Sequence, residues 1–140
     1  MRDQTREALL PLSLLAAASG ARAMAGVAAI SPRIPVKALA AAELVGDKLP
    51  IAPNRIAPAL LLGRVATGML VGAAVGGRTG MHRGESALIG GLIAFASTHA
   101  TYRMRRALSR RLPPLAAAFV EDAIVLGTAA AGAALLRSER

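Results

Sequence analysis

The sequence predicts an all-α fold: a polytopic bundle of four to five hydrophobic helices that lies in a membrane. Hydrophobic residues make up 54% of the chain and charged residues only 18%, below the roughly 25% of charged residues typical of soluble domains. The apolar residues gather in five segments, and proline, glycine and charge occupy the breaks between them, as turns require. Because open strands cannot satisfy their backbone hydrogen bonds in lipid, the segments are expected to be helices. The length suits a single domain, residues 1–140.

The five apolar segments differ in how well they suit a membrane-spanning helix, which needs about 20 residues. The first, third and fifth are long enough, the fourth is short, and the second contains a cluster of charge. Residues 1–23 alternatively resemble a signal peptide that ends at "ARA", but the apolar character continues to Ile30, which favours a first membrane helix. The segments are residues 8–30, 34–52, 56–77, 86–102 and 115–136.

The second segment carries Glu43, Asp47 and Lys48. A central acid or lysine costs about 2.5–3.5 kcal/mol on the insertion scale, whereas a leucine or isoleucine returns only about 0.3–0.6 kcal/mol. The aliphatic residues of the segment cannot offset these charges, so the segment either leans on protein partners or enters the membrane and returns. Glu43 and Asp47 are four residues apart and share a helical face, which we expect to point into the bundle or a wet cavity.

Other apolar segments carry charges of both signs. Arg22 lies in the first segment, Arg64 in the third, and the adjacent acids Glu121 and Asp122 in the fifth. Charged groups within membrane segments almost always face the protein interior and pair with one another. We expect Glu43 to lie near Arg22 or Arg64, with Glu121 on the opposite side of the same polar interior. Two interpretations follow: buried ion pairs that fix helix packing, or a polar pathway that binds an ion.

Glycines recur every four residues in the third segment, at Gly68, Gly72 and Gly76. Overlapping G-x-x-x-G motifs of this kind, a glycine zipper, let a neighbouring helix approach closely. Arg64 lies on the same helical row, so it is expected to face a packed helix. The partner is either another segment of this chain or a second copy in a homo-oligomer.

The net charge of +9 does not indicate nucleic-acid binding, because the basic residues stand mostly between apolar segments and few aromatics accompany them. That distribution is typical of membrane loops. The densest basic cluster, within residues 103–111, is predicted to be cytoplasmic and the C-terminus external. With five crossings the N-terminus is internal; with a re-entrant second segment it is external. The predicted location is the bacterial inner membrane, with the lipid bilayer as partner.

Residues that support catalysis or metal binding are scarce. The chain has no cysteine and only two histidines, so a transition-metal site is not expected. The acids have no adjacent histidine or nucleophile, and no P-loop or other nucleotide motif is present. We therefore expect neither an enzyme nor a bound cofactor.

Several short motifs resemble a bacterial integral-membrane family catalogued as domain of unknown function 4126. They are "ASGARA" at 18–23, "ELVGDKLP" at 43–50, "RIAPALLLGRVATG" at 55–68 and "VED" at 120–122. The resemblance spans nearly the whole chain, and the E-L-x-x-D-K-[IL]-P block is its most specific part. It implies a small multi-helix membrane protein without an established activity. The signature positions are Ser19, Gly20, Arg22, Glu43, Asp47, Lys48, Glu121 and Asp122.

A shift of 78 residues superimposes Ala18-Ser19 on Ala96-Ser97 and Glu43 on Glu121. Two explanations are open: chance agreement in an alanine-rich chain, or an internal repeat with halves 8–77 and 86–136, in opposite orientation if three crossings separate the copies. Inverted repeats with broken helices are a transporter architecture, and the Ser19-Gly20 pair is a candidate break.

The leading functional hypothesis is a small ion- or proton-coupled carrier. In it, Glu43, Asp47 and Glu121 bind a cation or proton, and Arg22 and Arg64 neutralise the empty site. The alternative is a structural or assembly protein of the membrane whose buried ion pairs only fix helix packing.

Overall fold

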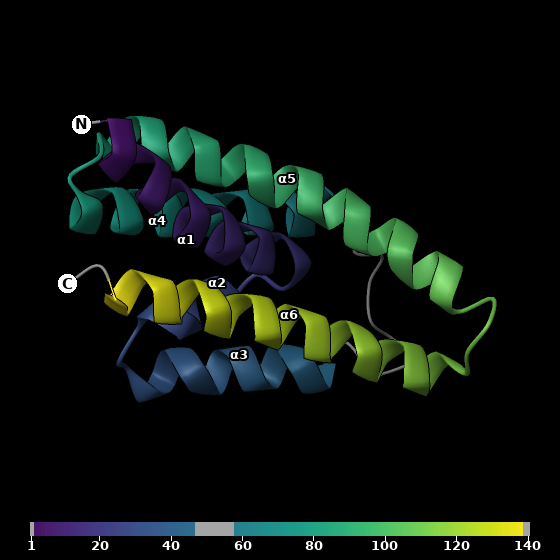
Figure 1. Cartoon of the computed structure of the whole chain (residues 1–140). Coiled ribbons are helices and arrows are strands. Elements are labelled where there is room, and N and C mark those ends of the chain that lie inside the picture. Colours follow the sequence, from purple (N-terminus) through teal and green to yellow (C-terminus); the bar gives the residue numbers. More distant parts are fainter. Residues whose placement is uncertain (1, 47–57, 139–140) are drawn as a thin grey trace.

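The computed structural model describes residues 2–46 and 58–138, with the backbone alone for residues 2–6 and 44–46. Within these residues the chain is all-helical (Figure 1). Asp47 and Lys48, together with the end of the second predicted segment, lie outside the described residues. The helices are α1 (Arg2–Ala21), α2 (Ala25–Ile30), α3 (Ile34–Gly46), α4 (Pro58–Thr79), α5 (Arg83–Leu108) and α6 (Pro114–Ser138).

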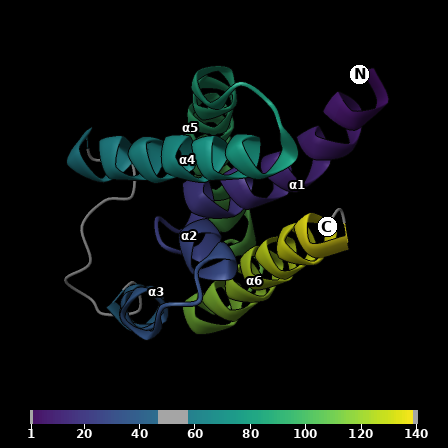
Figure 2. The same ribbon diagram turned by 90° about the vertical axis from the view of Figure 1, so that its left-hand side faces the viewer.

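The first apolar segment is not one helix, as predicted, but two. α1 ends at Ala21, the chain turns through residues 22–24, and α2 runs back toward the end from which α1 came (Figures 1 and 2). The fourth segment, in contrast, is longer than predicted, because α5 continues past residue 102 to Leu108 without a break.

The reversal at residues 22–24 changes the expected arrangement of the chain. Both termini and the α4–α5 turn lie at one end of the bundle, and the α5–α6 turn lies at the other (Figure 1). The observed reversal lies in the first segment, whereas the end of the second segment, the one predicted to enter the membrane and return, lies outside the described residues. α1 and α5 both start at the end that holds the termini, so these equivalent helices of the predicted repeat are parallel rather than inverted.

Small residues allow α4 and α5 to pack closely. Gly68, Gly72 and Gly76 are buried, and a Cβ added to Gly72 would lie 2.1 Å from the carbonyl oxygen of Ser86. The same addition at Gly68 would lie 2.7 Å from the carbonyl oxygen of Gly90. The glycine row thus faces a helix of this chain. The turn between α4 and α5 includes Gly80, whose φ of 75° is readily adopted only by glycine.

The polarity of α5 is the reverse of that in a soluble amphipathic helix. A soluble helix buries its large apolar side chains and exposes polar ones. On α5 the buried positions are Ser86, Gly90, Gly91, Ala94 and Thr98, and the exposed large side chains are Leu88, Leu92 and Phe95.

Large apolar side chains also cover the outside of the other long helices, as at Leu62 and Leu70 on α4 and Phe119 and Leu126 on α6. In the described part of the chain, α4 and α6 are long and apolar enough to cross a membrane.

α3 lies at the periphery of the bundle. It packs mainly against α2, and most of its described side chains are exposed, including Ile34 at 80%. α1, in contrast, packs against α4, α5 and α6. The helix break between α1 and α2 lies between this packed core and the peripheral α3 (Figure 2).

Candidate polar site at the helix break

Glu43, on α3, binds the backbone of the helix break. The N–H of Ala23 donates to its Oε1 (2.8 Å), and the N–H of Met24 donates to its Oε2 (2.9 Å). In an uninterrupted α-helix these two N–H groups would donate to the carbonyl oxygens of Ser19 and Gly20, four residues earlier. The carboxylate of Glu43 therefore replaces two backbone acceptors, which is how the chain can leave the helix there without burying unpaired donors.

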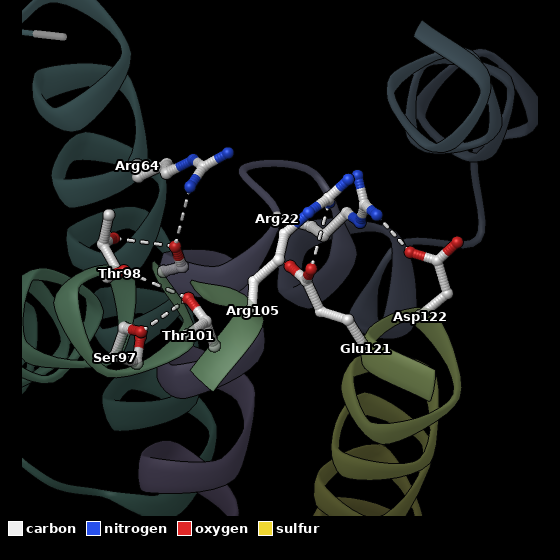
Figure 3. A network of polar contacts seen from close by, with 9 residues as sticks. Arg22, Arg64, Ser97, Thr98, Thr101, Arg105, Glu121 and Asp122 are labelled. Carbon is white, nitrogen blue, oxygen red and sulfur yellow. Dashed lines mark hydrogen bonds and ion pairs between the residues drawn. The ribbon is translucent and has the colours of Figure 1, made fainter. Parts of the chain in front are cut away.

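The Gly20 carbonyl, released by the break, accepts from two other helices. The hydroxyl of Thr98 on α5 lies 2.7 Å from it, and Nη1 of Arg64 on α4 donates to it over 3.5 Å (Figure 3). Ser97 donates to the carbonyl of Ala17, one turn earlier on α1 (3.0 Å). The end of α1 is thus fixed by polar side chains from both neighbouring helices.

Two arginines from different elements point toward the adjacent acids on α6 (Figure 3). Arg22, at the break, forms an ion pair with Asp122. Nη1 of Arg105, near the end of α5, lies 3.1 Å from Oε2 of Glu121. Glu121 and Asp122 are adjacent and project from α6 at different angles. Both are nevertheless buried, and each has an arginine as its partner.

Most of the charges that meet in this region are buried, and Glu43 and Arg105 are partly buried. Glu121 is 0% exposed and Arg22 only 1%, so neither charge has water as its main partner. Buried ions of one sign are tolerated only with partners of the other sign or several hydrogen bonds. Among the described residues, the contacts above involve three cations and three anions, of which two of each form ion pairs and the others bind backbone groups. They are Arg22, Arg64 and Arg105, and Glu43, Glu121 and Asp122.

A cavity of about 290 Å³ reaches the site from the side, between α2, α3 and α6. Arg22 and Glu43 line one part of it, alanines of all three helices form most of its wall, and Lys37 and Arg137 also line it. Glu121 does not line this cavity. Of the described acids in the cluster, Glu43 is the one that a small solute in the cavity would contact.

The structure brings most of the predicted site residues together, with one change of partner. We expected Glu43 to lie near Arg22 or Arg64. Arg22 does line the same cavity, but both oxygens of Glu43 bind backbone N–H groups. The break leaves these two N–H groups without acceptors in the helix. They therefore need another acceptor at that place.

Ser19 is fully buried beside the break, and its hydroxyl has no hydrogen-bond partner among the described residues. Within the described residues, no group of three or more histidine, aspartate and glutamate side chains gathers as metal ligands do. The site as described is therefore one of ion pairs and backbone groups.

Sequence reasoning missed the role of Arg105 and assigned it to a cytoplasmic loop. It stands inside α5, and its long side chain reaches Glu121 on the next helix. The available signal was the short length of the fourth apolar segment, which an extension to Leu108 corrects. Thr98 is a polar residue of that segment, but its bond to the Gly20 carbonyl depends on the reversal at residues 22–24, which was not predicted.

No family model, curated protein or solved structure matches this chain. The interpretation of the site therefore depends on its own geometry.

Proposed function

We propose that this chain is a small multi-pass protein of the bacterial inner membrane. The outward leucines and phenylalanines, together with helix contacts made by glycine, alanine, serine and threonine, support this location. Between helices in lipid, close approach of small residues and polar contacts replace the hydrophobic drive of water.

We further propose that the protein carries a proton or small cation, and that Glu43 is the coupling group. The observation that carries this proposal is the double engagement of Glu43, which holds the helix break and lines the cavity. Discontinuous helices with exposed backbone groups are a recurring feature of transporter binding sites. When a proton or cation occupies the carboxylate, its interaction with the two N–H groups weakens, so occupancy is linked to the geometry of the break.

The peripheral position of α3 supports this mechanism. α3 is held to the described bundle mainly through α2 and through the bonds of Glu43. Loss of those bonds frees the helix to move without disturbing the packed contacts of α1, α4 and α5. Thr98 and Arg64 keep the end of α1 in place while α3 moves.

Proton flux into liposomes that contain the purified protein tests the proposal. With a pH-sensitive dye inside and an imposed potassium diffusion potential, the parent protein is expected to acidify vesicles faster than protein-free liposomes. Glu43→Gln should reduce this flux to the protein-free level, because a neutral amide neither binds a proton at physiological pH nor balances a cation. The matched control is Glu85→Gln, an exposed acid on α5, which should retain the flux.

The same assay is repeated with sodium and potassium gradients. If the ion flux with the parent protein never exceeds the flux in protein-free liposomes, the carrier proposal is wrong. Retention of flux by Glu43→Gln would instead remove Glu43 from the mechanism.

A second candidate, a structural or assembly role, is favoured by the balance of buried charge described above. A site in which each described ion already has a partner needs no transported ion. In that case Glu43→Gln lowers stability, and neither the parent protein nor the variant moves protons, sodium or potassium.

A further inference from the structure

A second cavity adjoins the first at the end of the bundle that holds the termini. It measures about 360 Å³ and shares Ala29, Lys37, Ala133 and Arg137 with the first cavity. Arg78, at the end of α4, also lines it. The two cavities together form one groove along α6, from the end of the bundle to the helix break.

The end of this groove is strongly basic. Lys37, Arg78 and Arg137 come from three different helices and converge on the second cavity, and no described carboxylate lines it. Backbone contacts position both arginines: Arg78 donates to the carbonyl of Ile30 (3.4 Å) and Arg137 to that of Ala133 (3.2 Å). A guanidinium has five N–H donors, so each arginine retains donors for an anion.

Apart from Arg22 and Glu43 at the helix break, the rest of the groove is apolar, and it has the length of one membrane leaflet. Its α6 wall extends from Val125 to Arg137, which at the helical rise is about 18 Å. The hydrocarbon core of a bilayer is about 30 Å thick, so one leaflet is about 15 Å. Alanines from α2, α3 and α6 line most of this length.

We propose that the groove between α3 and α6 binds one anionic phospholipid. The phosphate lies between Lys37, Arg78 and Arg137, and an acyl chain follows the alanine-lined wall of α6 toward the helix break. The charge of the basic end requires an anion, and the apolar groove that continues from it suits a hydrocarbon chain. A soluble phosphate would satisfy only the first of these two features. The inference rests on the proposed membrane location. That location is tested separately by asking whether detergent is needed to extract the protein from membranes.

Native mass spectrometry of the detergent-purified full chain tests the proposal. The protein is titrated with phosphatidylglycerol or with phosphatidylcholine of the same acyl chains, and one phosphatidylglycerol is expected to remain bound with at least about tenfold preference, given the attraction of basic clusters for anionic lipid. The triple variant Lys37→Gln, Arg78→Gln, Arg137→Gln should lose this preference. The matched control is the triple variant Arg103→Gln, Arg110→Gln, Arg111→Gln, which removes the same charge from exposed positions near the α5–α6 turn. This control should keep the preference for phosphatidylglycerol.

Single variants at Arg78 and Arg137 are measured too, so that misfolding of the triple variant, seen as lost helicity, does not decide the result. Ala130→Phe fills the apolar part of the groove, where Ala130 is exposed, and should weaken binding of the lipid. Equal retention of the two lipids, or equal loss in the basic-end and control variants, would overturn the proposal. Displacement of phosphatidylglycerol by millimolar glycerol phosphate would assign the basic end to a soluble anion and also overturn it.

Discussion

The two stretches that match at an offset of 78 residues are both helical, but the first one contains a break. The first stretch forms α1 and α2, separated at residues 22–24, and the second forms the single helix α5. α2 and α5 nevertheless end at equivalent C-cap serines, Ser31 and Ser109. The sequences that follow, "SPRIP" and "SRRLP", match at the same offset and lead into α3 and α6. The break at residues 22–24 is therefore the clearest difference between the two stretches in the described residues.

The equivalent glutamates show what the break changes. Glu43 accepts from two backbone N–H groups, whereas Glu121 accepts from the side chain of Arg105. In α5 the backbone donors are used within the helix, so a carboxylate beside it needs a side-chain donor. In the first copy the open backbone supplies the donors itself. The same acid thus holds a broken helix in one copy and pairs with a continuous one in the other.

The copies also touch each other at equivalent positions. Thr98 binds the carbonyl of Gly20, and these two residues are 78 positions apart. The helices α1 and α5 therefore cross where Gly20 and Thr98, which match at the 78-residue offset, are in contact. Substitutions at this crossing and at the break therefore measure separately how the two stretches contribute to stability.

The largest effect is expected from Asp122→Ala, because this acid joins the break to α6. Its partner Arg22 has no charged equivalent, since the residue 78 positions later is Ala100. Removal of one partner of a buried pair costs about 3–5 kcal/mol, because the other charge stays buried. Thermal unfolding in detergent measures this loss, with the exposed acid change Glu7→Ala as control. Equal stability of the two variants would show that the pair does not hold the break.

A smaller loss is expected from Gly20→Ala at the crossing of α1 and α5. The added Cβ would lie 2.2 Å from the carbonyl oxygen of Ala94, so a helix must shift, at a cost of about 1–3 kcal/mol. The control is Gly127→Ala on α6, where nothing lies within 4 Å of the added atom. There the better helix propensity should stabilise by about 0.5–1 kcal/mol. A stabilising Gly20→Ala would mean that α1 and α5 are not in close contact at this position.

Sequence reasoning predicted the helical class and the glycine row because both depend on local patterns. Apolar runs define the helices, and the spacing of Gly68, Gly72 and Gly76 defines a face that α5 covers. The Ser19-Gly20 pair was a candidate break, but the reversal at residues 22–24 was not predicted, because "GARAMAG" contains no proline and the acceptor that stabilises the break, Glu43, is about 20 residues away. Arg105 was missed for a related reason: its role depends on how far its side chain reaches, which sequence position does not reveal.

The smallest effect is expected from Thr98→Val, which tests the contact between equivalent positions of the two copies. The hydroxyl lies 2.7 Å from the carbonyl of Gly20 and 2.8 Å from that of Ala94 in its own helix. Thr128 on α6 bonds only within its own helix, to the carbonyl of Ile124 (2.7 Å), so Thr128→Val controls for the loss of a local bond. We expect Thr98→Val to cost about 1 kcal/mol more than this control in thermal unfolding, the usual net value of a hydrogen bond. An equal cost would mean that Arg64 alone satisfies the Gly20 carbonyl, and that the crossing is held by packing of small residues rather than by the polar contact.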